Sequence, residues 1–229
     1  MGSGTATGRG TGRGTVVGVL GGSGGVGASS FAAVLAAVAD RSVLIDLDVS
    51  GGGVDVLLGI ERVPGARWSG LRVAGGHLDP ESLVGGLPRW GGCSVLAADV
   101  AVLEAEAVLQ VVEVASSAAP VVLDLPRAGC AERAAALLRC DLVVAVARAD
   151  VGGLVAAHAV VSALPELPVG VVVRRGDVSG AEAARLVGAP LLGELPPVSS
   201  TRFVLDPARL PRAAERVAGG VLAGIGVAA

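Results

Sequence analysis

The feature that most constrains this chain is a glycine-rich stretch between an apolar run and an alanine-rich run. Residues 21–30 read Gly-Gly-Ser-Gly-Gly-Val-Gly-Ala-Ser-Ser. Residues 15–20 are β-branched and apolar, which predicts a buried parallel strand, and residues 29–40 predict a helix. Glycines allow positive φ and close approach of a ligand, while the first-turn N–H groups of a helix attract negative charge. We therefore expect this loop to bind the phosphates of a nucleotide.

Two ligand classes fit the loop. Gly22, Gly24 and Gly27 spell G-x-G-x-x-G, with Asp46 and Asp48 about 20 residues further on, which is the pattern of dinucleotide-binding folds. That pattern has little specificity in a chain with 36 glycines. Alternatively, residues 23–30 align with the phosphate loop of P-loop ATPases, and the loop alone is also compatible with a tight turn that binds nothing.

Acidic residues close two of the predicted strands and favour the P-loop interpretation. The apolar run 42–48 ends in Asp46 and Asp48, and the run 120–126 ends around Asp124. Ligand-binding groups gather at the carboxyl ends of strands in open α/β sheets, and residues two apart in a strand face the same side. Together with the Ser29 hydroxyl, which can ligate Mg²⁺, these aspartates form the set that a nucleotide-hydrolysing P-loop protein needs.

Strands and helices alternate along the rest of the chain. This alternation predicts an α/β fold with a parallel, doubly wound sheet. Residues 61–91 are punctuated by Gly and Pro and carry Trp68 and Trp90, which we expect to pack this segment onto the sheet. We predict further strands at 93–97, 142–147, 169–174 and 191–195. We also predict a short helix that ends near residue 60, a short helix near 80–84, and longer helices at 101–117, 129–139, 151–163, 180–187 and 207–222.

Composition restricts the class of protein. The chain has 229 residues, 52% hydrophobic content and a net charge of -3, which suits a single domain at 15–229 preceded by a low-complexity, flexible tail at 1–14. Its 18 basic residues are all arginines and are scattered, which argues against nucleic-acid binding. Three cysteines without a C-x-x-C pair favour neither zinc nor disulfides. We expect a cytoplasmic protein, because no signal peptide or membrane-spanning run is evident.

Four segments together resemble one family, the MinD/ParA-type P-loop ATPases with a deviant Walker A loop. Within it they are most similar to the CpaE-like branch, which includes TadZ and the actinobacterial septum-site-determining protein Ssd. The resemblance extends over residues 15–222. The segments are Gly-Gly-Val-Gly-Ala-Ser at 24–29, Val-Leu-Ile-Asp-Leu-Asp at 43–48, Val-Val-Leu-Asp-Leu-Pro-Arg at 121–127 and Gly-Ala-Pro-Leu-Leu-Gly-Glu-Leu-Pro at 188–196.

The resemblance implies a three-layer α/β/α P-loop NTPase fold with a mostly parallel, doubly wound sheet. It also implies binding of ATP or ADP with Mg²⁺, and a homodimer that sandwiches ATP and acts as a positional switch. CpaE-like members are linked to the placement of pilus or Tad-type secretion machines, or to septum control. Partners would then be secretion, pilus or division proteins, and these would recruit the chain to the membrane or the cell pole.

The resemblance also implies roles for individual residues of this chain, according to their positions in the family motifs. The resemblance assigns Asp48 to orienting the attacking water, and Ser29, Asp46 and Asp124 to Mg²⁺, directly or through water. The nucleotide-binding residues that it implies are Gly24, Gly25, Val26, Gly27, Ala28, Ser29, Ser30, Asp124 and Arg127.

Departures from the family pattern are equally informative. Ser23 and Ala28 stand where the family has its two loop lysines, and the chain has no lysine at all. Losing both cations removes charge that stabilises phosphoryl transfer, so we expect nucleotide binding with weak or absent hydrolysis. Arg127 could replace one cation, or lie in a solvated loop. Arg174 and Arg175 stand where relatives often carry an asparagine that reads adenine, which leaves the base open.

Two alternative functions accompany the ATP-binding positional factor. One is a nucleotide-free scaffold that keeps the fold and holds partners through residues 61–91. The other is an NAD-dependent oxidoreductase, which only the glycine pattern supports.

Overall fold

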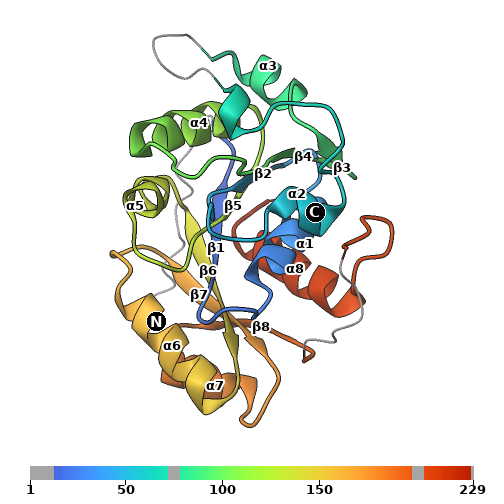
Figure 1. Cartoon of the computed structure of the whole chain (residues 1–229). Helices are drawn as coiled ribbons and strands as arrows, with labels where there is room; N and C mark the ends of the chain where they lie inside the picture. The colour runs from blue at the N-terminus through green and yellow to red at the C-terminus, as the bar shows by residue number, and fades with distance from the viewer. Residues whose placement is uncertain (1–12, 72–77, 198–203, 228–229) are drawn as a thin grey trace, which may run out of the picture.

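The computed structural model describes residues 13–71, 78–197 and 204–227 (Figure 1). Its centre is an eight-stranded sheet in the order β3-β4-β2-β5-β1-β6-β7-β8, in which only β3 runs antiparallel to its neighbour. The strands are β1 Val16–Gly21, β2 Val43–Asp46, β3 Arg89–Trp90, β4 Cys93–Leu96, β5 Val121–Asp124, β6 Leu142–Arg148, β7 Val169–Arg174 and β8 Leu191–Leu195. The predicted mostly parallel, doubly wound sheet is confirmed.

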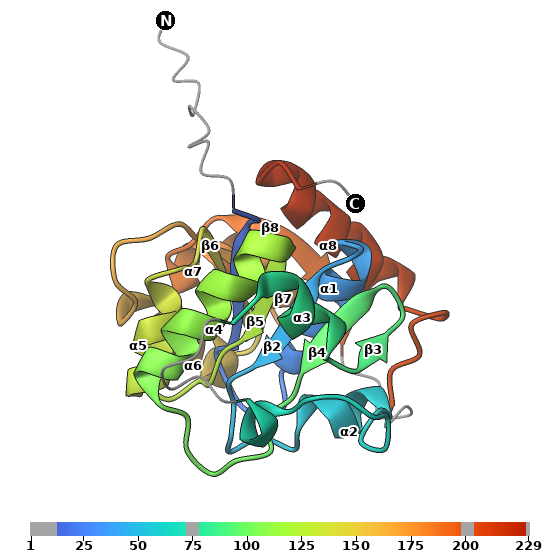
Figure 2. The same cartoon turned by 90° about the horizontal axis from the view of Figure 1, so that it is seen from above.

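Helices cover both faces of the sheet. Figure 2 shows α1 and α8 together on one side and α4 and α5 on the other, and α6 and α7 continue the second layer in Figure 1. The helices are α1 Ala28–Val38, α2 Val54–Leu58, α3 Pro80–Gly85, α4 Ala105–Ala118, α5 Ala131–Leu137, α6 Val151–Ser162, α7 Gly180–Val187 and α8 Arg212–Gly224. The fold is therefore the predicted three-layer α/β/α arrangement.

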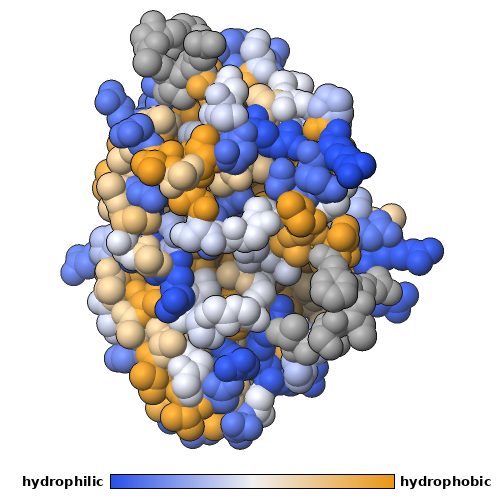
Figure 3. Space-filling view, in the orientation of Figure 1, coloured by the Kyte–Doolittle hydropathy of each residue, from blue (hydrophilic) through white to orange (hydrophobic). Residues whose placement is uncertain are grey.

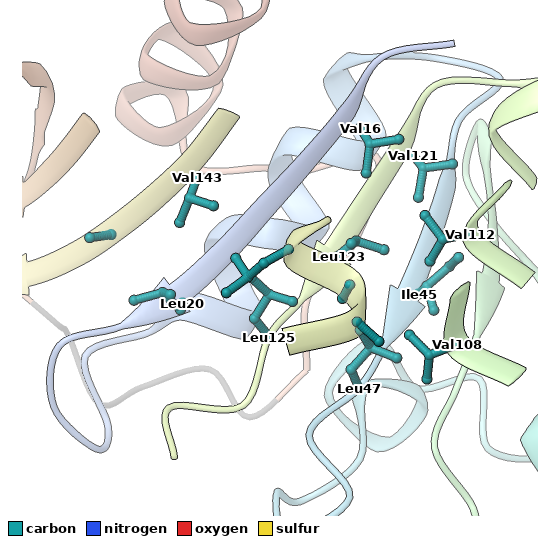
Figure 4. Close-up of a cluster of buried hydrophobic side chains, with 14 of the residues drawn as sticks. Val16, Leu20, Ile45, Leu47, Val108, Val112, Val121, Leu123, Leu125 and Val143 are labelled. Atoms are coloured by element: carbon teal, nitrogen blue, oxygen red, sulfur yellow. The ribbon is translucent and has the colours of Figure 1, made fainter. Parts of the chain in front are cut away.

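Alternating side chains of the parallel strands supply two cores. On the α4 side, Ile45 of β2 and Leu123 of β5 are fully buried against Val108 and Val112 of α4 (Figure 4). On the other side, the intervening strand residues pack with α1 and α8, where Phe31 is buried. Because both faces are covered, the strands read as continuous apolar runs in the sequence, as parallel strands do.

Strand order places the glycine loop at the point where the sheet reverses its direction of growth. The chain builds β2, β4 and β5 on one side of β1, and β6, β7 and β8 on the other. Ligands in open α/β sheets bind beyond the carboxyl ends of the strands at such a point. The loop after β1 therefore lies where this architecture forms its binding crevice.

Several element boundaries differ from the predictions. The helix predicted at 101–117 begins at Ala105, and the one predicted at 207–222 begins at Arg212, directly after Pro211. A residue that precedes proline is disfavoured in the helical region, which delays the start of α8. The chain also forms a 3₁₀ turn at Trp68–Gly70 and the short strand β3, neither of which was predicted.

Both tryptophans are buried, as expected. Trp68 packs into the α4-side core and donates from Nε1 to the Asp46 carbonyl at 2.9 Å. Trp90 packs into the opposite core from β3. At the other end of the chain, Arg13 pairs with Asp141 at 2.8 Å, so this residue of the predicted tail contacts the domain. The remainder of that tail, residues 1–12, lies outside the described residues.

Hydrophobic colour gathers over α6 and α7 at the lower left of Figure 3, where Val151, Val155 and Leu186 are exposed. None of the helices in the described parts of the chain has the length and hydropathy needed to cross a bilayer.

Candidate functional site

The glycine loop makes a tight connection between β1 and α1. Gly25 and Gly27 have φ of 68° and 85°, values that other L-residues rarely adopt. Gly22 donates to the Val146 carbonyl at 2.9 Å, and a Cβ on Gly22 would lie 2.5 Å from the Ala157 Cβ of α6. Glycine is therefore required by close packing at the base of the loop and by backbone conformation at its tip.

The first turn of α1 opens directly from the loop. The first helical hydrogen bond runs from the Phe31 N–H to the Gly27 carbonyl at 3.0 Å. The N–H groups of Ala28, Ser29 and Ser30 therefore have no partner within the helix, and α1 has no acidic residue in this turn. Together with the helix dipole, these groups favour an anion at this end of α1.

A pocket of about 710 Å³ lies in front of the loop. The loop residues, the ends of β2 and β5, and the segment leading into α2 form its walls. In Figure 3 the centre of this face is pale, the colour of weakly polar residues such as the glycines and serines that line the pocket. Its lining includes all of the predicted site residues: Gly24, Gly25, Val26, Gly27, Ala28, Ser29, Ser30, Asp46, Asp48, Asp124 and Arg127.

Asp124 and Ser29 meet at the floor of this pocket. Asp124 ends β5 with only 3% of its surface exposed, and the Ser29 side chain interacts with its carboxyl group. Burial, reinforced by the neighbouring charge of Asp46, raises the pKa of Asp124 to about 8. The ionised form therefore lacks a compensating charge, and a cation at the Ser29–Asp124 pair would supply one.

Asp46 lies beside Asp124, opposite it in the β2–β5 register. Its carboxylate oxygens accept from the N–H groups of Asp48 at 3.0 Å and Val54 at 3.1 Å. Burial raises the pKa of Asp46 to about 6, although these hydrogen bonds oppose the shift. Both oxygens thus hold the loop between β2 and α2, a structural role that the sequence did not indicate.

Asp48 and Arg127 lie nearer the mouth of the pocket. Asp48 is partly exposed just beyond the end of β2, and one of its oxygens accepts from the Ser50 N–H at 3.2 Å. Arg127 is exposed, and its carbonyl accepts from Arg133 Nη1 at 2.5 Å. This bond fixes the backbone at Arg127, and the residue contributes to the pocket lining.

Ser23 and Ala28 occupy the two loop positions where the resemblance led us to expect lysines. Ser23 and Ala28 line the pocket, and the Ser23 hydroxyl is buried without a hydrogen-bond partner among the described residues. Within those residues, no group of three or more His, Cys, Asp or Glu side chains is arranged to hold a metal ion.

Arg174 is a contact of the loop that sequence reasoning missed. Its Nε donates to the Val26 carbonyl and its Nη1 donates to the Pro196 carbonyl at 3.1 Å. Val26 and Arg174 are 148 positions apart, so only the parallel packing of β1, β6 and β7 brings them together. The sequence shows the two adjacent arginines, but it does not show that the Arg174 side chain points toward the glycine loop.

The dinucleotide interpretation fits this geometry poorly. In the dinucleotide-binding fold the acidic residue stands on the strand next to the first strand. Here β5 separates β1 from β2, and Asp46 is occupied by backbone N–H groups.

Comparisons with known proteins identify two sequence relatives, and no family model matches the chain. Both are uncharacterized proteins of Mycobacterium tuberculosis, from two strains, and each is 40% identical over 183 residues. The match covers 76% of this chain and 52% of each relative, so the chain spans about half the length of the curated relatives that it matches.

Several solved structures have the same architecture, and their names place them among the ParA and MinD proteins. A ParA family ATPase from Chlorobium tepidum has a TM-score of 0.70 at 18% identity and covers 93% of both chains. The MinD cell division protein of Aquifex aeolicus has a TM-score of 0.66 at 20% identity, covering 91% of this chain and 97% of that one. MinD of Pyrococcus horikoshii, solved with Mg-ADP, has a TM-score of 0.65 at 16% identity, covering 92% and 98%. The chain therefore has the fold of the ParA and MinD P-loop ATPases.

Proposed function

We propose that this chain binds ATP or ADP together with Mg²⁺ in the pocket in front of the glycine loop. One observation carries the proposal: the free N–H groups of α1 and the Ser29–Asp124 pair meet in a single pocket at the reversal point of the sheet. Mg²⁺ is typically held by one or two protein oxygens, phosphate oxygens and waters. Ser29 and Asp124 would hold the ion, and Asp46 and Asp48 would contact its water shell.

Slow or absent hydrolysis follows from the charges of this pocket. When bound, Mg²⁺ neutralises part of the phosphate charge. In the loop, Ser23 and Ala28 contribute no cation to the charge that develops during phosphoryl transfer. Arg127, which lines the pocket, is the cation that would approach a phosphate, and Asp48 is the residue that would orient a water. The chain therefore retains more of what binding requires than of what catalysis requires.

The biological role that we propose is a nucleotide-dependent, dimerising positional or regulatory factor of the CpaE-like type. Neighbouring folds support the class, since one of them is a MinC:MinD cell division complex. Two apolar side chains, Val56 at the pocket and Val204 near α2, are exposed where a second copy could cover the nucleotide. We propose a cytoplasmic chain that pilus, secretion or septum proteins recruit to the membrane or the cell pole.

Calorimetric titration of the purified full chain tests nucleotide binding. ATP, ADP and NAD are titrated separately with Mg²⁺, and the Asp124→Asn variant and the exposed-acid control Asp177→Asn are titrated with ADP. We expect ATP and ADP to bind to the wild type and the control, and to bind more weakly to Asp124→Asn. If no adenine nucleotide binds at millimolar concentration, the proposal is wrong and the scaffold function replaces it. Binding of NAD alone would favour an oxidoreductase.

Phosphate release and oligomeric state test the switch. We expect slow release by the wild type and slower release by Asp48→Ala, and equal rates would remove Asp48 from the reaction. Light scattering with a non-hydrolysable ATP analogue should show a dimer that ADP does not support. A monomer under both conditions would contradict the sandwich dimer.

A further inference from the structure

Arg174 links the glycine loop to the far edge of the sheet. It ends β7, it is half-buried, and it joins the Val26 carbonyl to the Pro196 carbonyl. Its neighbour Arg175 is exposed, and its backbone N–H donates to the Leu195 carbonyl at 2.9 Å. Two adjacent arginines thus differ in their relation to the loop.

The guanidinium of Arg174 is paired with carbonyls rather than with an acid. The ion pairs among the described residues do not include it. Burial lowers the pKa of Arg174, which marks the cost of removing its charge from water. A half-buried cation without a carboxylate partner is stabilised by dipoles and by any nearby anion. The positive charge of Arg174 therefore favours the binding of an anion near the loop.

Arg174 packs closely against Gly27. A Cβ on Gly27 would lie 2.5 Å from Arg174 Nη2. Gly27 also has a φ of 85°, so the backbone conformation itself favours glycine at the residue that precedes α1. The guanidinium is therefore held against the Val26–Gly27 peptide.

Peptide geometry determines what this contact does. In a planar trans peptide the C=O of one residue and the N–H of the next point in opposite directions. The Val26 C=O points to Arg174, so the Gly27 N–H points away from it. Val26 and Gly27 line the pocket and Arg174 does not, so the side of the loop away from Arg174 is the pocket side.

We propose that Arg174 is a positioning residue for phosphate binding: it holds the Val26 carbonyl so that the Gly27 N–H is directed into the pocket. An N–H donor that is already oriented toward the ligand needs no reorganisation on binding, so it binds the ligand more strongly than a mobile donor does. The cation also polarises the same peptide, which strengthens its N–H as a donor. The inference rests on the proposed phosphate site. It assigns to Arg174, at the end of β7, a contribution of positive charge next to a loop that has no lysine.

Binding of inorganic pyrophosphate by four full-length proteins tests this role. Wild type, Arg174→Ala, Arg174→Lys and Arg175→Ala are titrated by calorimetry with Mg²⁺. Arg175→Ala is the matched control, because it removes the same charge one residue away without touching the loop. We expect about tenfold weaker binding by Arg174→Ala, little change in Arg175→Ala, and partial recovery in Arg174→Lys, which can donate one bond to Val26. Equal affinity of Arg174→Ala and wild type would overturn the inference, as would equal losses in both alanine variants.

An amide spectrum separates positioning from simple loss of stability. Labelling valine with ¹³C at the carbonyl and glycine with ¹⁵N restricts the spectrum to glycines that follow valine, Gly27 among them. We expect pyrophosphate to shift the Gly27 resonance in wild type and Arg175→Ala, and to shift it much less in Arg174→Ala. A full shift in a folded Arg174→Ala protein would overturn the inference.

The same spectra distinguish this inference from the proposed function. If wild type binds no pyrophosphate and no nucleotide, the phosphate site itself is wrong. The ligand-free Gly27 resonance then still reports on the contact, and Arg174→Ala should move it further than Arg175→Ala does. No difference between the two variants would show that Arg174 does not hold this peptide.

Discussion

The buried carboxyl group of Asp124 makes stability depend on pH in a way that one substitution should remove. Its pKa is about 8 in the folded chain, against an ordinary value of 3.8, mainly because of burial. A raised folded pKa means that the native state holds a proton which the unfolded chain releases. Stability from this group is therefore present at low pH and is lost as pH rises toward and through 8.

The size of the effect follows from linkage. One proton held only by the native state changes the free energy of unfolding by at most about 1.4 kcal/mol per pH unit. Integrating a single site with a folded pKa of about 8 from pH 6 to pH 8 gives a loss on the order of 2 kcal/mol. Asp46, with a folded pKa of about 6, loses most of its contribution below this window.

Urea denaturation of the metal-free protein at pH 6, 7 and 8 measures this loss. We expect the free energy of unfolding of Asp124→Asn to fall less between pH 6 and pH 8 than that of wild type, by about 2 kcal/mol. Asp177→Asn, which removes an exposed acid, should keep the wild-type dependence. Groups that all three proteins share cancel in the differences. Parallel curves for wild type and Asp124→Asn would refute the assignment of a protonated Asp124.

Three other substitutions probe the same region and the core. Asp46→Asn leaves one acceptor oxygen for the three backbone N–H groups that donate to the carboxylate, so urea denaturation at pH 7 should show a loss of about 1–2 kcal/mol. Ser29→Ala should weaken ADP binding in Mg²⁺ buffer about tenfold, measured by calorimetry, and have little effect in EDTA. Leu123→Ala, at a fully buried position between β5 and α4, should lower the free energy of unfolding by about 2–5 kcal/mol in the same denaturation assay.

Local patterns made the strands, the loop and its acids predictable. The run from Val43 to Asp46 and the run from Val121 to Asp124 are continuous apolar segments that end in a carboxylate, and the sheet aligns them directly. Strand-end position alone was enough to place Asp124 in the pocket beside Ser29. These features depend on neighbours in the sequence and on the general rules of parallel sheets.

Features that depend on tertiary contacts were not predictable. Asp46 has the sequence context of a metal ligand, but its oxygens bind backbone N–H groups of a loop whose path could not be inferred from spacing. Trp90 lies in a strand of only two residues, too short to leave a periodic pattern. Arg174 contacts Val26 because β6 is inserted between β1 and β7, a consequence of strand order.

The charges around the pocket lead to a final expectation about its dependence on metal. The ionisable side chains that line it are Asp46, Asp48, Asp124 and Arg127, so carboxylates outnumber cations. Attraction of phosphate comes from the N–H groups of α1, from the helix dipole and, in our proposal, from the peptide held by Arg174. These partial charges oppose a repulsion that a loop lysine would ordinarily reduce, so Mg²⁺ must provide most of the neutralisation. ADP affinity should therefore fall at least about tenfold when EDTA replaces Mg²⁺ in the calorimeter. Asp124→Asn removes one metal ligand, and the wild-type carboxyl group is already largely protonated at pH 7 without the ion, so the variant should bind ADP in EDTA about as well as wild type does. Equal affinity of wild type in both buffers would show that the pocket attracts phosphate without the ion.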